Sequence, residues 1–226
     1  MASFAAVEVA IAGAHGQIGR RLTRRLVERG HRVQGLIRNP DHADDVRADG
    51  GEPVVCDLET AAVDEIAAAI DGANAVVFAA GAGPGSGAER KWTMDRDGAV
   101  KLLEAARAGE IERYLMVSSI GAENPPAGDD VFSVYLRAKA EADQALMASD
   151  RSWTIVRPGH LTRDAGDKRA RVDDQPLRGD ISRDDVAELL AVLLSESRAV
   201  GRTLYVVEGE EPLEGALEAV LSRSPS

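Results

Sequence analysis

The feature that most constrains the fold of this chain is a glycine-rich turn between an apolar run and an amphipathic segment. Residues 7–12 are apolar apart from one glutamate, and residues 17–29 carry apolar side chains at helical spacing. Gly13, Gly16 and Gly19 lie at the junction. In a strand–turn–helix unit, such glycines permit a tight turn, let backbone N–H groups approach a phosphate and let the helix pack closely. The junction therefore predicts a site for the pyrophosphate of a dinucleotide.

Apolar runs and helical patterns alternate along the rest of the chain. The expected strands are residues 7–12, 32–37, 53–56, 75–80, 113–117, 153–156 and 203–207. The expected helices are residues 17–29, 61–70, 91–108, 131–148, 184–194 and 213–221. This order predicts one α/β domain over residues 1–226, built on a doubly wound parallel sheet with right-handed crossovers.

The loops beyond the carboxyl ends of the strands are where such a sheet binds its ligands. We expect the pocket to be built from residues 81–95, 120–134 and 158–180. Residues 160–180 are polar and show no clear period, which predicts an irregular loop.

The charge balance argues against several classes of partner. Asp and Glu outnumber Lys and Arg 38 to 27, which gives a net charge of −11. Such a surface repels nucleic acid and anionic lipid. No apolar run approaches the ~20 residues of a membrane span, and the single cysteine, Cys56, fits a reducing compartment. We expect a cytoplasmic monomer or homodimer that acts on a small molecule and binds neither nucleic acid nor membranes.

The spacing G-x-x-G-x-x-G resembles the cofactor loop of extended and atypical short-chain dehydrogenases/reductases. Further similar motifs follow in the family's order: Cys56-Asp57-Leu58, Phe78-Ala79-Ala80-Gly81, Met116-Val117-Ser118-Ser119, Tyr135-Leu136-Arg137-Ala138-Lys139 and Ile155-Val156-Arg157-Pro158-Gly159. The resemblance spans about residues 7–208 and implies a Rossmann fold that binds NAD(P). The cofactor residues predicted on both grounds are Gly13, His15, Gly16, Gln17, Ile18, Gly19, Arg38, Asp57, Leu58, Ala79, Ala80, Gly81, Lys139 and Pro158. Of these, His15 is interpreted most simply as a solvent-side residue of the turn.

Arg38 predicts NADP(H) in preference to NAD(H). The second expected strand ends at this arginine, about 20 residues beyond the last glycine, and no acid follows until Asp41. An acidic residue at this place accepts hydrogen bonds from the ribose hydroxyls of NAD, whereas a guanidinium pairs with the 2′-phosphate of NADP.

Tyr135 and Lys139 are the candidate reaction centre. They are four residues apart on an expected helix and so share one face. A nearby ammonium lowers the pKa of a tyrosine from about 10 towards neutrality, which would make Tyr135 a usable general acid. By resemblance, Lys139 also binds the nicotinamide ribose, and Ser119, with Ser118 as the alternative, polarises the substrate oxygen.

His160 is a competing candidate for the reaction centre. It follows the sixth expected strand, and its segment resembles the flavin and biliverdin reductase branch of the superfamily, where a histidine lies near the substrate. A plain loop histidine is an equally open interpretation.

Two classes of function remain open. The first is an NADP(H)-dependent oxidoreductase that reduces a small or planar carbonyl, quinone or flavin-like acceptor. The short stretch after the last expected strand leaves little room for a substrate domain, which disfavours a nucleotide-sugar epimerase. The second is a non-catalytic NADP(H)-binding redox sensor similar to NmrA-type proteins, which generally lack the tyrosine–lysine pair.

Overall fold

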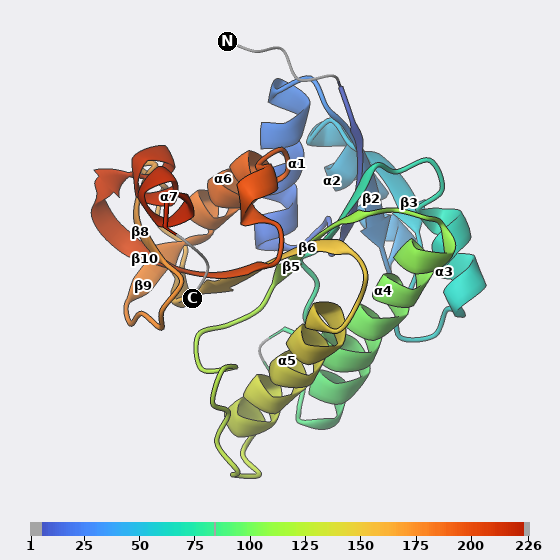
Figure 1. The fold of residues 1–226 in the computed structure, drawn as a ribbon. Coiled ribbons are helices and arrows are strands. Elements are labelled where there is room, and N and C mark those ends of the chain that lie inside the picture. The colour runs from blue at the N-terminus through green and yellow to red at the C-terminus, as the bar shows by residue number, and fades with distance from the viewer. Residues whose placement is uncertain (1–5, 84, 224–226) are drawn as a thin grey trace.

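The computed structural model describes residues 6–83 and 85–223, which form a sheet between two layers of helices (Figure 1). The sheet has eight strands in the order β3-β2-β1-β4-β5-β6-β10-β8. All neighbours are parallel except β10 and β8. Their bounds are β1 (Glu8–Ala12), β2 (Arg32–Ile37), β3 (Glu52–Val55), β4 (Ala75–Phe78), β5 (Arg113–Val117), β6 (Ser152–Pro158), β8 (Arg169–Asp173) and β10 (Arg202–Pro212). The predicted doubly wound α/β fold is confirmed.

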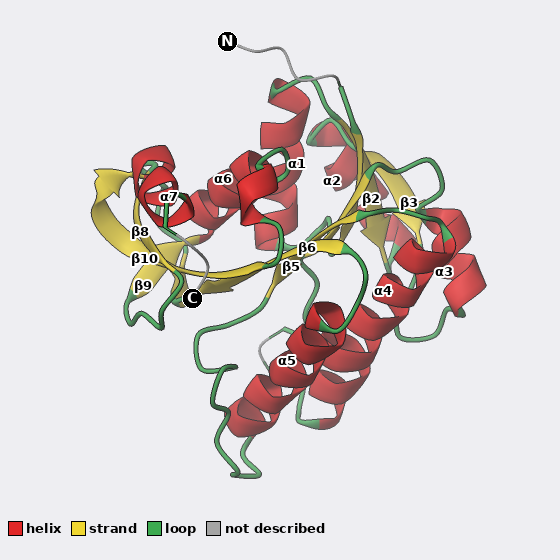
Figure 2. Ribbon diagram, viewed as in Figure 1, coloured by secondary structure: helices red, strands yellow, loops and turns green. Residues whose placement is uncertain are grey.

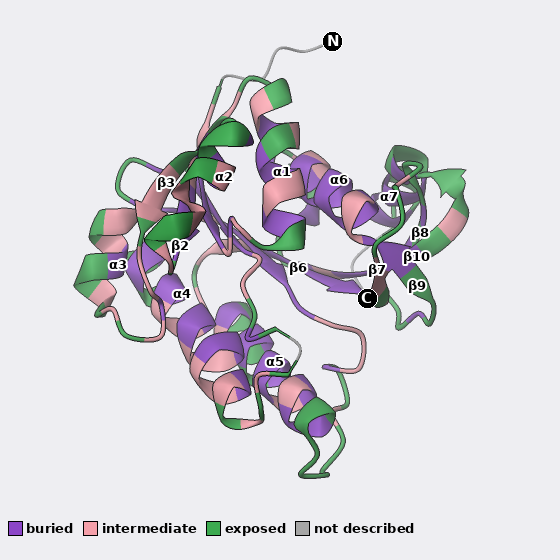
Figure 3. Cartoon of the chain, turned by 180° about the vertical axis from the view of Figure 1, so that it is seen from behind, coloured by how far each residue is buried: buried purple, intermediate pink, exposed green. Residues whose placement is uncertain are grey.

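Helices cover both faces of the sheet (Figure 2). Helices α1 (Gln17–Glu28), α6 (Arg183–Leu193) and α7 (Leu213–Leu221) lie over one face; α3 (Val63–Ala69), α4 (Ala99–Ala108) and α5 (Val131–Met147) lie over the other. Alternate residues of β1 belong to two separate cores, with Val9 and Ile11 in the first and Ala10 and Ala12 in the second. Figure 3 shows the resulting burial of the central strands, as expected for strands covered on both faces.

Residues 160–180 are more regular than the sequence predicts. Strands β7 (His160–Thr162) and β9 (Asp180–Ser182) pair with each other in a small parallel sheet, and β8 joins the edge of the main sheet. The expectation of an irregular loop is therefore wrong. Arginines at alternate positions of β8 concealed the strand, because its buried face carries only Ala170 and Val172.

The expected helix over residues 91–108 consists of two parts. Its first part, η2 (Lys91–Gly98), is π-helical, and α4 continues from Ala99. Wide turns of this kind occur often at functional sites, and η2 packs against α5. Two short helices, η1 (Pro40–His42) and α2 (Ala43–Ala48), occupy a segment for which no element was expected, and η3 (Ser197–Ala199) follows α6.

No helix in the described ranges is long and apolar enough to cross a membrane. The predicted first strand, residues 7–12, lies within the described residues, whereas Pro84 in the expected pocket segment 81–95 lies outside them.

Candidate functional site

The glycine turn has the tight geometry that its sequence predicts. Gly13 adopts φ = 83°, and a Cβ there would lie 2.7 Å from the backbone of Ala80. A Cβ on Gly19 would lie 2.2 Å from the Gly13 carbonyl oxygen. Gly16 is the N-cap of α1 and carries no side chain that would cover the first free N–H groups of the helix. This arrangement fits a pyrophosphate bound at the helix N-terminus.

A cavity of about 800 Å³ extends from this turn along the carboxyl ends of the strands. The predicted cofactor residues that line it are Gly13, His15, Gly16, Gln17, Ile18, Arg38, Asp57, Leu58, Ala79, Ala80, Gly81 and Lys139. Gly19 and Pro158 are not in its lining: Gly19 packs against the turn, and the Pro158 carbonyl accepts a hydrogen bond from Ile120 N. Each expected loop contributes to the wall, for example through Lys91, Phe132 and Leu161.

Arg38 lies at one end of the cavity beside an acid that the sequence reasoning missed. Its Nη1 atom lies 3.2 Å from Oε2 of Glu59, and the arginine side chain is half exposed. Glu59 also accepts hydrogen bonds from Arg90 and Thr93. Burial opposes the ionisation of Glu59, but these hydrogen bonds hold its pKa below its usual value. A 2′-phosphate would therefore have to compete with a carboxylate for Arg38.

The two histidines near Arg38 form a stacked pair. The rings of His15 and His42 lie 3.6 Å apart, and His15 Nε2 lies 2.9 Å from the Asp45 carboxylate. Both histidines line the cavity. His15 is thus a wall residue held by two neighbours, rather than only a solvent-side residue of the turn.

Tyr135 and Lys139 lie together at the other end of the cavity. Both line it, and Lys139 Nζ lies 5.9 Å from the centre of the tyrosine ring. The ammonium donates a hydrogen bond to the Val117 carbonyl at 3.1 Å and forms an ion pair with Asp95 Oδ1 at 3.3 Å. The other oxygen of Asp95 accepts from the N–H of Ala82 at 3.1 Å. Asp95, on η2, is a second site residue that the sequence reasoning missed.

The expected lowering of the Tyr135 pKa towards neutrality is wrong. Burial raises the pKa of Tyr135, and the ammonium of Lys139 opposes this only in part, since Asp95 acts in the same direction as burial. Burial would lower the pKa of Lys139, but the charge of Asp95 holds it above its ordinary value. Tyr135 is accordingly a protonated phenol at neutral pH, and the lysine beside it is charged.

The candidate serines do not extend freely into the cavity. Ser118 lines it, but its hydroxyl donates to Asp143 at 2.8 Å. Ser119 donates to the Ile120 carbonyl at 3.1 Å and lies outside the lining. Ser119 nevertheless acts on Tyr135, because its hydroxyl opposes in small part the rise in the tyrosine pKa that burial causes.

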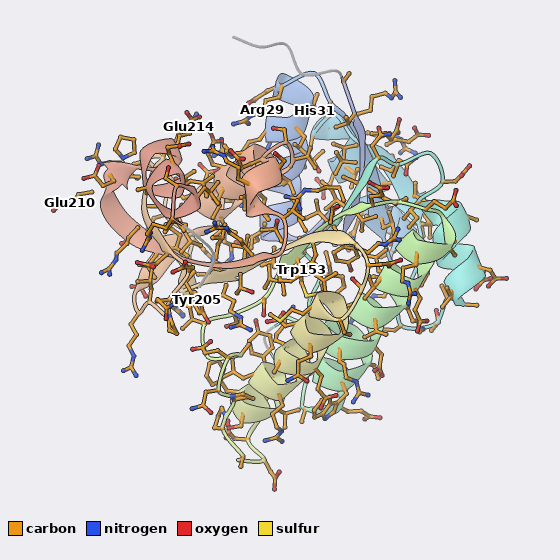
Figure 4. The ribbon with its side chains drawn as sticks, in the orientation of Figure 1. Arg29, His31, Trp153, Tyr205, Glu210 and Glu214 are labelled. Carbon is orange, nitrogen blue, oxygen red and sulfur yellow. The ribbon has the colours of Figure 1, made fainter. Side chains whose placement is uncertain are left out.

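Asp143 belongs to a buried network that no sequence motif revealed. Its Oδ2 atom accepts from Arg157 Nη2 at 2.9 Å, and Arg157 Nη1 donates to the Tyr205 hydroxyl at 2.7 Å. Tyr205, labelled in Figure 4, extends from β10. Burial raises the pKa of Asp143 although Arg157 opposes the shift. The network joins α5 to β6 and β10 directly behind Ser118.

His160 does not belong to the wall of the cavity that holds Tyr135 and Lys139. It is exposed at the start of β7, its backbone N–H donates to the Gly179 carbonyl, and it is not in the lining of the cavity. Its neighbour Leu161 lines the cavity instead. Tyr135 and Lys139 therefore belong to the cavity wall, and His160 does not.

The fold and this cavity define the class of protein. A glycine turn with φ > 0 leads into a helix N-terminus, and the cavity follows the carboxyl edge of a doubly wound sheet. These are the features of an NAD(P)-binding Rossmann domain of the atypical short-chain dehydrogenase/reductase kind.

Comparison with known proteins places the chain in a family. Residues 13–197 match the model of the NAD(P)H-binding family, so the chain belongs to that family. It is 36% identical over 213 residues to a Bacillus subtilis protein described as the uncharacterized sugar epimerase YhfK, covering 94% of this chain and 99% of the relative.

Two further matches differ in the activity their names state. A Bacillus halodurans structure, described as a putative NAD-dependent epimerase/dehydratase, superposes with a TM-score of 0.88 at 33% identity, covering 95% of this chain and 100% of that one. The ceramide reductase of Caulobacter vibrioides is 36% identical over 159 residues, which is 70% of this chain and 47% of that protein.

Proposed function

We propose that this protein is an NADP(H)-dependent reductase of a carbonyl, quinone or flavin-like acceptor. The observation that carries the proposal is that one cavity joins the glycine turn and Arg38 at one end to Tyr135 and Lys139 at the other. An extended dinucleotide bound along the strand ends would bring its nicotinamide towards the tyrosine. The ceramide reductase among the relatives supports a reduction as the reaction.

The residues predicted from the sequence for the reaction end of the cavity, where Tyr135 and Lys139 lie, are assigned as follows. Bound NADPH would supply the hydride, that is, two electrons and one proton. Tyr135 donates the proton to the acceptor oxygen, so that a carbonyl becomes an alcohol. Lys139, held by Asp95, stabilises the phenolate that remains. Ser119 contacts the tyrosine, while Ser118 is engaged by Asp143.

NADP(H) is the proposed cofactor because Arg38 lines the cavity and keeps part of its guanidinium exposed. The contact of Arg38 with Glu59 reduces the expected preference for NADP(H) over NAD(H), since the 2′-phosphate has to replace Glu59 as the partner of the guanidinium.

Cofactor oxidation with a panel of acceptors tests the proposal. The purified protein is mixed with NADPH or NADH and with aldehydes, quinones and flavins, and the loss of reduced cofactor is followed. Faster oxidation of NADPH than of NADH with at least one acceptor supports the reductase. Tight NADPH binding with no oxidation by any acceptor would instead identify the sensor class. Conversion of a sugar nucleotide without net cofactor oxidation would identify an epimerase, the activity named for the Bacillus subtilis relative.

A further inference from the structure

Lys91 is a buried cation at the reaction end that the scheme above leaves without a role. It is 7% exposed and lines the cavity, and its Nζ atom lies 5.5 Å from the centre of the Tyr135 ring. Within residues 6–83 and 85–223, the one hydrogen-bond partner of this Nζ atom is the carbonyl of Gly83, at 2.8 Å. An ammonium has three protons to donate, so the described protein leaves donor capacity directed into this space.

The charges around Lys91 leave a positive excess. Burial lowers the pKa of Lys91, and the charge of Asp95 opposes this shift only in part. Asp95 forms its ion pair with Lys139, and no carboxylate of the described chain lies within ion-pair distance of Lys91. Tyr135 stays neutral because burial raises its pKa. Two ammonium groups therefore face one carboxylate, and a buried charge without a partner is costly. A negatively charged ligand would remove this imbalance.

The wall beside Tyr135 is apolar. Val131 and Phe132, the first residues of α5, are 46% and 61% exposed and both line the cavity. The Phe132 ring lies 6.0 Å from the Tyr135 ring. Exposed large apolar side chains gathered at a cavity mark a ligand surface.

We propose that the acceptor is an apolar anion, whose negatively charged group binds Lys91 and whose apolar body lies against Val131 and Phe132. This proposal rests on the reductase function above and names the class of its substrate. Lys91 is then the residue that selects acceptors by charge, and Phe132 contributes affinity without regard to charge.

A matched pair of non-reactive probes tests this assignment. The affinities of 2-naphthoate and 2-naphthamide, which share an apolar body and differ in charge, are measured by calorimetry with and without saturating NADP⁺. The wild-type protein should prefer the carboxylate by about ten- to a hundredfold, the usual value of one charge-assisted contact. Lys91→Met should abolish this preference by weakening only the binding of naphthoate. Phe132→Ala should weaken the binding of both probes by the same factor.

Lys168→Met is the control, because this lysine is 65% exposed and does not line the cavity; it should behave as wild type. Far-ultraviolet circular dichroism reports whether Lys91→Met is folded, and Lys91→Gln replaces it if it is not. Equal wild-type affinity for both probes, no binding of either, or a preference that survives in Lys91→Met would overturn the proposal. So would a parallel loss of NADP⁺ affinity, which would assign Lys91 to the cofactor.

The outcome is separable from that of the proposed function because binding of the probes requires no turnover. If the preference for the charged probe depends on Lys91 but no acceptor of the panel supports NADPH oxidation, the anion site is supported and the reductase function is rejected. NADPH oxidation with no probe preference keeps the reductase and rejects the anion site.

Discussion

Replacing Asp95 with asparagine removes one charge from the ion pair with Lys139 while keeping the shape of the side chain and an oxygen that can accept from Ala82 N. The exposed fractions of the two side chains are 1% and 4%, so water does not screen the pair. Removing one partner of a buried pair typically costs about 3–5 kcal/mol, because the other charge remains buried without compensation. Lys139 keeps its hydrogen bond to the Val117 carbonyl, which places the expected loss of unfolding free energy near the lower end, at about 3 kcal/mol.

Urea unfolding followed by circular dichroism measures this loss. The matched control is Asp97→Asn, which also removes an acid from η2 but at a side chain that is 43% exposed and pairs with Arg96; it should cost under about 1 kcal/mol. A double-mutant cycle with Lys139→Met separates the pair from other effects. The double variant should be more stable than the sum of the two single losses predicts. An Asp95→Asn protein as stable as the control, with additive effects in the cycle, would refute the pairing.

Two further predictions concern the cofactor and the chemistry. Arg38→Ala should weaken NADPH binding by about tenfold and leave NADH binding almost unchanged. The loss is modest because the phosphate already competes with Glu59 for Arg38. Calorimetric titration would show equal losses for both cofactors if Arg38 does not bind the phosphate. Tyr135→Phe should keep NADP⁺ affinity and lower kcat by ~10²–10⁴-fold. His160→Ala should lower kcat only slightly, because His160 is outside the cavity lining. Steady-state rates in the reverse order would assign the proton donor to His160.

The parts of the site that the sequence could predict are those set by local chemistry. The turn at Gly13 requires φ > 0, and only glycine adopts this readily. The i, i+4 spacing placed Tyr135 and Lys139 on one face of a helix because helical geometry is regular. The doubly wound parallel sheet followed from the same alternation of short apolar runs and helices.

The parts that remained hidden are contacts between distant segments. Glu59 meets Arg38 and Asp95 meets Lys139 only after the sheet has formed, and neither acid is marked by a local motif. Asp95 did carry a weak signal, since helical spacing puts it on the same face as Ala99 and Leu102, both of which are buried. An acid on the apolar face of a helix predicts a buried partner, although it does not say which one.

The consequence of Asp95 for the reaction appears in the dependence of rate on pH. The sequence expectation, with Lys139 acting alone on Tyr135, gives a phenol that loses its proton near neutrality. The structure raises the pKa of Tyr135 above its ordinary value of about 10, and a general acid is active only while protonated. The rate of NADPH-dependent reduction should therefore show no loss attributable to Tyr135 between about pH 6 and pH 9. A decline with an apparent pKa of about 7 to 8 that disappears in Tyr135→Phe would show that Lys139 controls the tyrosine after all, and that Asp95 releases the ammonium when cofactor and acceptor are bound.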